Sequence, residues 1–194
     1  MLGVTGRTGS GKSMLTSMLA DRCSAVLDAD CIYAELLRTD RAMLDGIAAR
    51  FPGTVRDGVL DRKALGAAVF SDDAARLDLN RLTHPAVFRE CARRIGEAAP
   101  GVILLDVPLL FESGIDRLCD LTLGVTAPKA LSLARIMARD GISEQAARAR
   151  FDSQPNDRFY ERRCDLLLRN DGGLDEFRAQ IAQLFDRYLS DDPR

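Results

Sequence analysis

The strongest constraint on this chain is a glycine-rich segment near its start, residues 6–13, with the sequence GRTGSGKS. It matches the pattern G-x-x-x-x-G-K-[ST], in which backbone N–H groups turn inward around an anion and the following helix adds its positive N-terminal end. The pattern requires a strand before the loop and a helix after it. We expect Lys12 to neutralise the β- and γ-phosphates of a nucleotide and the Ser13 hydroxyl to hold Mg²⁺.

Short apolar runs alternate with longer segments of helical periodicity, which indicates βα units that wind a parallel sheet. A helix between Pro128 and Gly141 and an amphipathic helix from Leu174 to Tyr188 are also expected. The fold class is therefore α/β, a three-layer fold around a phosphate-binding loop and a five-stranded parallel sheet. The five predicted strands are Leu2 to Thr5, Ala25 to Leu27, Val102 to Asp106, Leu121 to Val125 and Leu166 to Leu168.

Two stretches do not fit a sheet. Ser71 to Gly101 contains no convincing strand, and Pro85 is expected to split it into two helices, because proline inside a helix removes a hydrogen bond and clashes. This stretch indicates a helical insertion. The Arg-rich stretch from Arg135 to Arg163 predicts a mobile flap beside the sheet.

Composition excludes several other classes of protein. The 194 residues are 46% hydrophobic and 29% charged, as in a single chain that folds alone. A net charge of −2 gives the protein no overall positive potential to attract nucleic acid, which argues against a nucleic-acid partner. Its five cysteines form no C-x-x-C pair, which suits a reducing compartment and argues against structural zinc and disulfides.

The sequence shows neither a secretory signal nor an apolar run of ~20 residues, the length that spans a bilayer. We therefore expect a soluble, cytoplasmic protein with no membrane partner, present as a monomer or a weak homo-oligomer.

Carboxylates follow two of the predicted strands. Asp28 and Asp30 come after the second strand, and on an extended chain they point to the same side. If that side faces the phosphate loop, one carboxylate can accept a proton from an attacking hydroxyl while the other orients metal-bound water or a substrate group. Alternatively, Asp30 only caps a helix that begins near Cys31. Asp106 ends the third strand, where it either lies near Mg²⁺ or only satisfies loop amides.

Arg135 and Arg139 lie four residues apart on one predicted helix, so both can contact a phosphate, although a solvated basic stripe has the same spacing. His84 precedes Pro85, and by itself it is more typical of a helix start than of catalysis. The chain lacks the N-K-x-D segment with which guanine-specific switches recognise their base, which argues against a GTPase.

Several motifs together resemble the dephospho-coenzyme A kinase family along nearly the whole chain. They are the phosphate loop, Asp28-Ala29-Asp30, His84-Pro85, the P-L-L-F-E segment at 108–112, Arg135-x-x-x-Arg139, Gln154 and Asn170.

The resemblance implies that ATP phosphorylates the ribose 3′-hydroxyl of dephospho-coenzyme A, the last step of coenzyme A synthesis. It also implies a core (1–30, 100–126 and 164–194), a helical coenzyme A-binding insertion (about 31–99) and a lid (about 127–163). Asp30 matches the base, Arg139 the lid arginine on ATP, Arg135 its helper and Asn170 a residue beside adenine. The ATP-binding positions are Gly6, Gly9, Ser10, Gly11, Lys12, Ser13 and the Met14 backbone, and the acceptor positions are Asp28, Asp30, His84, Pro108, Leu109 and Glu112.

The chain departs from the family at several positions. Arg7-Thr8 stand where Gly-Ile is common, Met14 replaces a threonine, Tyr160 replaces a lysine and Arg169 precedes Asn170 in place of Asp. Two alternatives remain: a kinase of the same fold that phosphorylates another small alcohol, nucleoside or nucleotide, and an ATP-bound regulatory module that has lost transfer.

Overall fold

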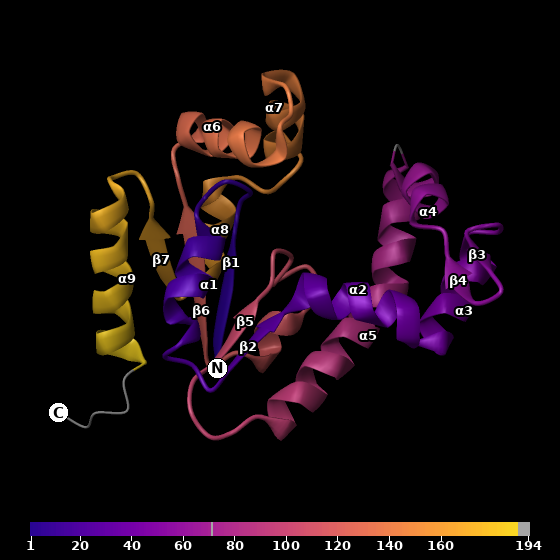
Figure 1. The fold of residues 1–194 in the computed structure, drawn as a ribbon, viewed down its shortest axis with the longest axis horizontal. Coiled ribbons are helices and arrows are strands. Elements are labelled where there is room, and N and C mark those ends of the chain that lie inside the picture. Colours follow the sequence, from indigo (N-terminus) through magenta and orange to yellow (C-terminus); the bar gives the residue numbers. More distant parts are fainter. Residues whose placement is uncertain (71, 190–194) are drawn as a thin grey trace.

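The computed structural model describes residues 1–70 and 72–189, and its centre is a five-stranded parallel sheet (Figure 1). The strand order is β2-β5-β1-β6-β7, so β1 lies in the middle. All five predicted strands are confirmed, with ends shifted by one residue at most. They are β1 (Leu2–Gly6), β2 (Ala25–Asp28), β5 (Ile103–Asp106), β6 (Leu121–Thr126) and β7 (Leu166–Arg169).

Helices cover both faces of this sheet, because consecutive side chains on a strand point to opposite sides. Leu104 packs in a cluster with α1 (Lys12–Ala20) and α9 (Leu174–Tyr188). Leu105, its neighbour on β5, packs in a second cluster with residues of α2 (Ala29–Thr39) and α5 (Asp73–Glu97). The predicted three-layer α/β class and the predicted last helix are therefore confirmed.

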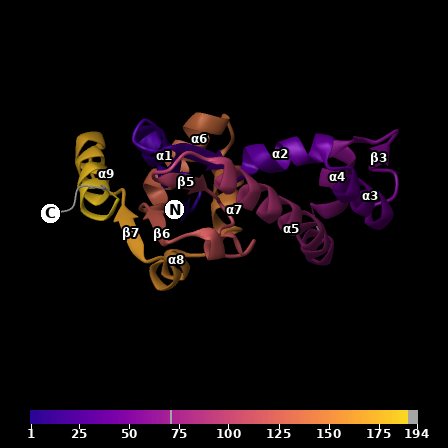
Figure 2. The ribbon, with the colours of Figure 1, turned by 90° about the horizontal axis from the view of Figure 1, so that it is seen from below.

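A second group of elements lies at the end of the molecule opposite α9 (Figures 1 and 2). These elements share a separate hydrophobic cluster that includes Ile47, Phe51 and Leu65. They are α2 (Ala29–Thr39), α3 (Arg41–Arg50), β3 (Val55–Arg56), β4 (Val59–Leu60), α4 (Arg62–Val69) and α5 (Asp73–Glu97).

The predicted break at Pro85 is wrong, because α5 runs through this proline without interruption. The ring lies on the exposed side of the helix, while Thr83, Ala86 and Val87 are buried. Water can therefore solvate the carbonyl that the proline leaves without a donor, and packing of the other face against α2, α3 and α4 holds the helix together.

The β3–β4 hairpin was not predicted. Its turn contains Asp57 with φ 51° and Gly58 with φ 73°, which is typical of the type I′ turn that joins two antiparallel strands. The Asp-Gly pair was the available sequence signal, but the two-residue strands beside it are too short to show alternation.

The predicted flap consists of three helices, α6 (Lys129–Asp140), α7 (Glu144–Asp152) and α8 (Asp157–Arg163), which we call the α6–α8 segment. Helices α6 and α7 lie beyond the carboxyl end of β6 (Figure 1). Leu133 and Ile136 of α6 pack against Ala147 and Phe151 of α7. A short 3₁₀ helix, η1 (Ile115–Leu118), completes the described elements.

Ser71, the first residue of the predicted insertion helices, and residues 190–194, the end of the predicted core, lie outside the described residues. Among the described residues, no helix has both the length and the apolar character that crossing a membrane requires.

We expect Leu104→Ala to lower the free energy of unfolding by about 3 kcal/mol, because it leaves a cavity in the centre of the sheet. Val59→Ala, on the 70% exposed side chain of the hairpin, is the matched control and should change it by less than about 0.5 kcal/mol. Urea denaturation measures both. A loss for Leu104→Ala no larger than for the control would contradict this view of the core.

Candidate active site

The parallel register brings three strand ends to the same edge of the sheet. Asp106 at the end of β5 pairs with Asp28 at the end of β2 on one side and with Val4 of β1 on the other. The glycine-rich loop follows β1 directly, so it lies beside both carboxylates. In α/β sheets, ligands bind at this carboxyl edge, where neighbouring connections leave in opposite directions.

The backbone of the loop has the curvature that anion binding requires. Gly9 and Gly11 have φ of 78° and 104°, a region that disfavours side chains. A Cβ on Gly11 would lie 2.2 Å from the Asn170 amide nitrogen. No side chain caps α1 at Gly11, which leaves the first N–H groups of the helix available to an anion.

The outer side of the loop is held by polar side chains. Buried Asn170 donates its amide N–H to the Ser10 carbonyl over 2.7 Å, and its own backbone N–H bonds to Thr126. Arg135 donates to the carbonyls of Gly9 and Ser10 and to the Asn170 side-chain oxygen at 3.2–3.4 Å. These bonds turn the loop carbonyls outward and support its curvature.

Lys12 is the cation at the base of the loop, and its Nζ bonds to Asp106. The other carboxylate oxygen of Asp106 accepts a 2.9 Å bond from the Thr16 hydroxyl. Ser13 lies exposed in the first turn of α1. The Met14 amide donates to the Gly11 carbonyl at 3.0 Å, so it is engaged within the loop.

Asp28 and Asp30 do not share an extended segment, so the predicted i, i+2 geometry is wrong. Helix α2 begins at Ala29 and Asp28 is its N-cap, accepting bonds from the N–H groups of Asp30 and Cys31 at 2.8 and 3.0 Å. The alternative in which Asp30 caps the helix is also wrong. Asp30 stands in the first turn of α2, where its carboxylate is free to contact a ligand.

Asp30 lies within reach of solvent, but the surrounding walls displace part of its water. This partial desolvation raises the pKa of Asp30, the Asp28 and Asp106 carboxylates raise it further, and Lys12 opposes them. A carboxylate with a raised pKa is a stronger proton acceptor than an ordinary aspartate.

A cleft of about 550 Å³ opens above the loop. Arg135, Arg139 and Arg150 of the α6–α8 segment line it together with Lys12. Arg139 donates to the Thr8 hydroxyl at 3.4 Å, and both Arg139 and Arg150 also bond to Asp140. This concentration of cations suits a ligand with several phosphates.

A second cavity of about 170 Å³ lies next to this cleft and shares Asp30 and Pro108 with it. Predicted residues His84 and Leu109 line it, with Val87 and Val107 as apolar neighbours. Burial lowers the pKa of His84 more than its hydrogen bond to the Glu112 backbone raises it, which favours the neutral imidazole. Glu112 itself is exposed and outside this cavity.

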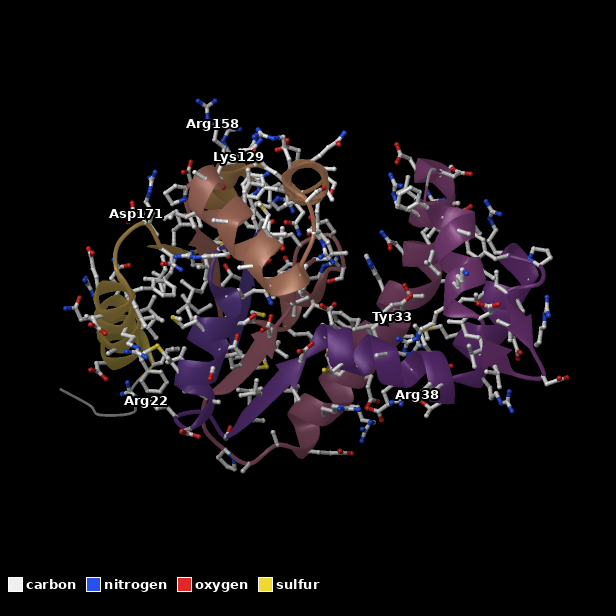
Figure 3. The ribbon with its side chains drawn as sticks, turned by 45° about the horizontal axis from the view of Figure 1, so that its top comes forward. Arg22, Tyr33, Arg38, Lys129, Arg158 and Asp171 are labelled. Carbon is white, nitrogen blue, oxygen red and sulfur yellow. The ribbon has the colours of Figure 1, made fainter. Side chains whose placement is uncertain are left out.

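A third cavity of about 350 Å³ extends from Asp30 into the insertion. Its walls are mostly apolar, with Leu37 and Leu65 among them, and Arg62 is its cation. Tyr33, labelled in Figure 3, lies in the wall of both this cavity and the previous one. The three cavities meet at Asp30.

Several residues in or near these cavities carried no role predicted from the residues themselves. Arg150 lay within a basic stretch with no distinguishing spacing, and Thr16 lay one turn after the loop pattern ends. Gln154 was noted only as part of the resemblance, and its oxygen accepts a 2.7 Å bond from the Thr8 N–H. Tyr160 is buried under β6, where burial raises its pKa to about 12, so it belongs to the core.

The chain matches the family model described as dephospho-CoA kinase over residues 1–176. Dephospho-CoA kinase of Syntrophotalea carbinolica is 39% identical over 195 residues, covering 97% of this chain and 92% of that protein. The enzyme of Symbiobacterium thermophilum is 41% identical over 187 residues, covering 93% and 78%.

Solved structures also resemble this chain. TT1252 from Thermus thermophilus superposes with a TM-score of 0.82 at 31% identity, with 97% of each chain covered. Dephospho-CoA kinase from Campylobacter jejuni gives 0.69 at 27% identity, covering 97% of this chain and 96% of that one. Shikimate kinase from Bacteroides thetaiotaomicron, at 10% identity and a TM-score of 0.58, shares the fold. The phosphate loop, the strand-end carboxylates and these relatives together show that the chain belongs to the dephospho-CoA kinase family.

Proposed function

We propose that this protein transfers the γ-phosphoryl group of ATP to the ribose 3′-hydroxyl of dephospho-coenzyme A, forming coenzyme A and ADP in the last step of coenzyme A synthesis. The observation that carries the proposal is the position of Asp30, which lines both the cationic cleft and the smaller cavity beside it. A carboxylate in that wall can contact an acceptor hydroxyl on one side and face the γ-phosphate on the other.

On the nucleotide side, the loop N–H groups and Lys12 hold the phosphates, while Arg135, Arg139 and Arg150 offset their charge. Phosphoryl transfer depends chiefly on positioning and charge stabilisation, and these are what the cleft offers. The contacts of Asn170 support a role in holding the loop and Arg135, in addition to the implied position beside adenine.

On the acceptor side, the adenosine end of the substrate enters the cavity lined by His84 and Leu109, so that its 3′-hydroxyl reaches Asp30. Asp30 accepts the hydroxyl proton as the oxygen attacks the γ-phosphorus and the bond to the β-phosphate oxygen breaks. Asp28 acts through Asp30. It caps α2, which positions Asp30 in the first turn, and its negative charge raises the pKa of Asp30.

The residues present fit Mg²⁺ bound together with ATP. The described residues contain no group of three or more His, Cys, Asp or Glu that could hold a metal alone. Mg²⁺ commonly uses one or two protein oxygens plus phosphates. Ser13 lines the cleft and offers its hydroxyl, and Asp106, which bonds to Lys12 and Thr16 at the adjoining strand end, would offer a second oxygen. When bound, the ion would neutralise charge on the β- and γ-phosphates.

The same proposal assigns α6–α8 as the lid, α2–α5 as the acceptor-binding insertion and a cytoplasmic location, with a monomer or weak homo-oligomer as the working form. Lid closure would exclude water, so that ATP is used for transfer and not hydrolysed.

The test is an assay of ADP release with Mg·ATP and dephospho-coenzyme A, with nucleosides and nucleotides as alternative acceptors. We expect release that depends on dephospho-coenzyme A and a 3′-phosphorylated product by mass. Release with only another acceptor would select a kinase of different specificity. No release with any acceptor, despite ATP binding, would select a regulatory module.

Asp30→Asn should lower kcat by a factor of about 10²–10⁴, because it removes the proton acceptor. ATP binding should persist, since the loop and its cations are unchanged. Steady-state kinetics and a nucleotide-binding titration measure the two effects. Near-normal turnover in this variant would show that Asp30 is not the base.

Asp28→Asn is the matched control, because asparagine also caps helices well but carries no charge. Since Asp30 must be ionised to act, kcat/KM falls as pH drops through its raised pKa. Asp28 raises that pKa, so Asp28→Asn should retain activity and move the acid limb of the pH profile to lower pH. An acid limb that stays in place would contradict this electrostatic coupling.

A further inference from the structure

Arg7, the second residue of the phosphate loop, reaches across to the lid. Its guanidinium carbon lies 3.5 Å from the centre of the Phe151 ring, and its Nη2 donates a 2.7 Å bond to the Phe151 carbonyl. Its Nη1 lies 3.7 Å from a carboxylate oxygen of Asp157. The side chain is 11% exposed, so these are contacts of a nearly buried cation.

These contacts fall on the negative end of one helix and on a carboxylate at the start of the next, and both attract an arginine. Phe151 is in the last turn of α7, where unpaired carbonyls give the helix a negative end. Asp157 is the first residue of α8. A planar guanidinium can stack on an aromatic ring and donate to a carbonyl at the same time, which lysine cannot do. The Arg7 side chain is therefore fastened to both helices.

The segment between those two helix ends, residues 153–156, carries Gln154. Its side-chain oxygen accepts the 2.7 Å bond from the Thr8 N–H, one residue after Arg7 in the loop. Arg150, which lines the phosphate cleft, immediately precedes Phe151. Fixing Phe151 and Asp157 thus fixes the chain on both sides of Gln154 and the backbone next to Arg150.

Helix α8 continues this connection to the acceptor side. The Phe159 ring packs edge-on against Phe111, with centroids 5.9 Å apart, and Phe111 belongs to the P-L-L-F-E segment after β5. One turn of α8 therefore contacts the nucleotide loop through Asp157 and the acceptor segment through Phe159.

We propose that Arg7 is a positioning residue, which holds the α7–α8 junction of the lid against the phosphate loop so that Gln154 and Arg150 face the transferring phosphate. Arg7 is also among the residues that line the phosphate cleft, but its guanidinium is engaged by Phe151 and Asp157, so its effect is exerted through the lid. The inference rests on the proposed transfer reaction and adds a residue-level reason why ATP is protected from water.

The test is Arg7→Leu, which keeps bulk but removes the charge and the donors. Because a hydrogen bond to a charged group is worth a factor of about ten or more, KM for ATP should rise about tenfold. With the lid loosened, more ADP than coenzyme A should form, whereas the wild type should release one ADP for each coenzyme A. Arg7→Lys, which keeps the charge and one donor, should recover part of both effects.

Arg158→Leu is the matched control, because Arg158 lies on the same helix but points outward from the molecule (Figure 3). It should leave KM for ATP and the ADP to coenzyme A ratio unchanged. Thermal unfolding of each variant distinguishes a loss of stability from a loss of lid positioning. Limited trypsin digestion gives a readout without turnover, since the arginines of α7 and α8 should be cut faster in Arg7→Leu than in the wild type.

A double-mutant cycle with Phe151→Leu tests the contact itself, and the two effects on KM should be less than additive because both substitutions remove one interaction. If Arg7→Leu does not fold, Asp157→Asn and Phe151→Leu carry the same test. If the folded variants still release one ADP for each coenzyme A and keep the wild-type KM for ATP, the proposal is overturned. If the wild type itself shows no release dependent on dephospho-coenzyme A, the proposed function fails instead.

Discussion

The active site depends on the parallel register of β1 with β5 and of β5 with β2. That register puts Asp106 beside the end of β1, from which the phosphate loop starts, and pairs it with Asp28, at which α2 starts. Lys12 and Asp30 thereby line the same cleft. The buried strands hold these positions, since Leu104 and Leu105 pack on opposite faces of the sheet.

The sheet, the glycine-rich loop and the last helix could be predicted because each has a strong local signal: buried apolar runs, a glycine pattern and an amphipathic stripe. The course of α5 through Pro85 could not, because it depends on which side of the helix is exposed. The predicted geometry of Asp28 and Asp30 was wrong for a related reason. Both residues favour a helix start, and only the structure shows that Asp28 takes the N-cap position.

Residue roles were harder to predict than elements, because a role depends on contacts between distant segments. Arg135 was expected to contact nucleotide, and its bonds to the carbonyls of Gly9 and Ser10 span more than 120 residues of sequence. Arg150 carried no signal, since its neighbours are also basic. Asn170 reaches the same loop carbonyl from the end of β7, which no spacing rule could foresee.

The phosphate loop and the α6–α8 segment are joined by direct contacts. Arg7 and Thr8 occupy the first variable positions of the loop pattern, so their side chains can vary without loss of the glycine turns. In this chain they are used for contacts with Phe151, Asp157 and Gln154. Because the phosphate loop is bonded to the α6–α8 segment in this way, we expect a change in its curvature to move α7 and α8. In the role that we propose for Arg7, binding of phosphate and exclusion of water are therefore linked within the protein itself.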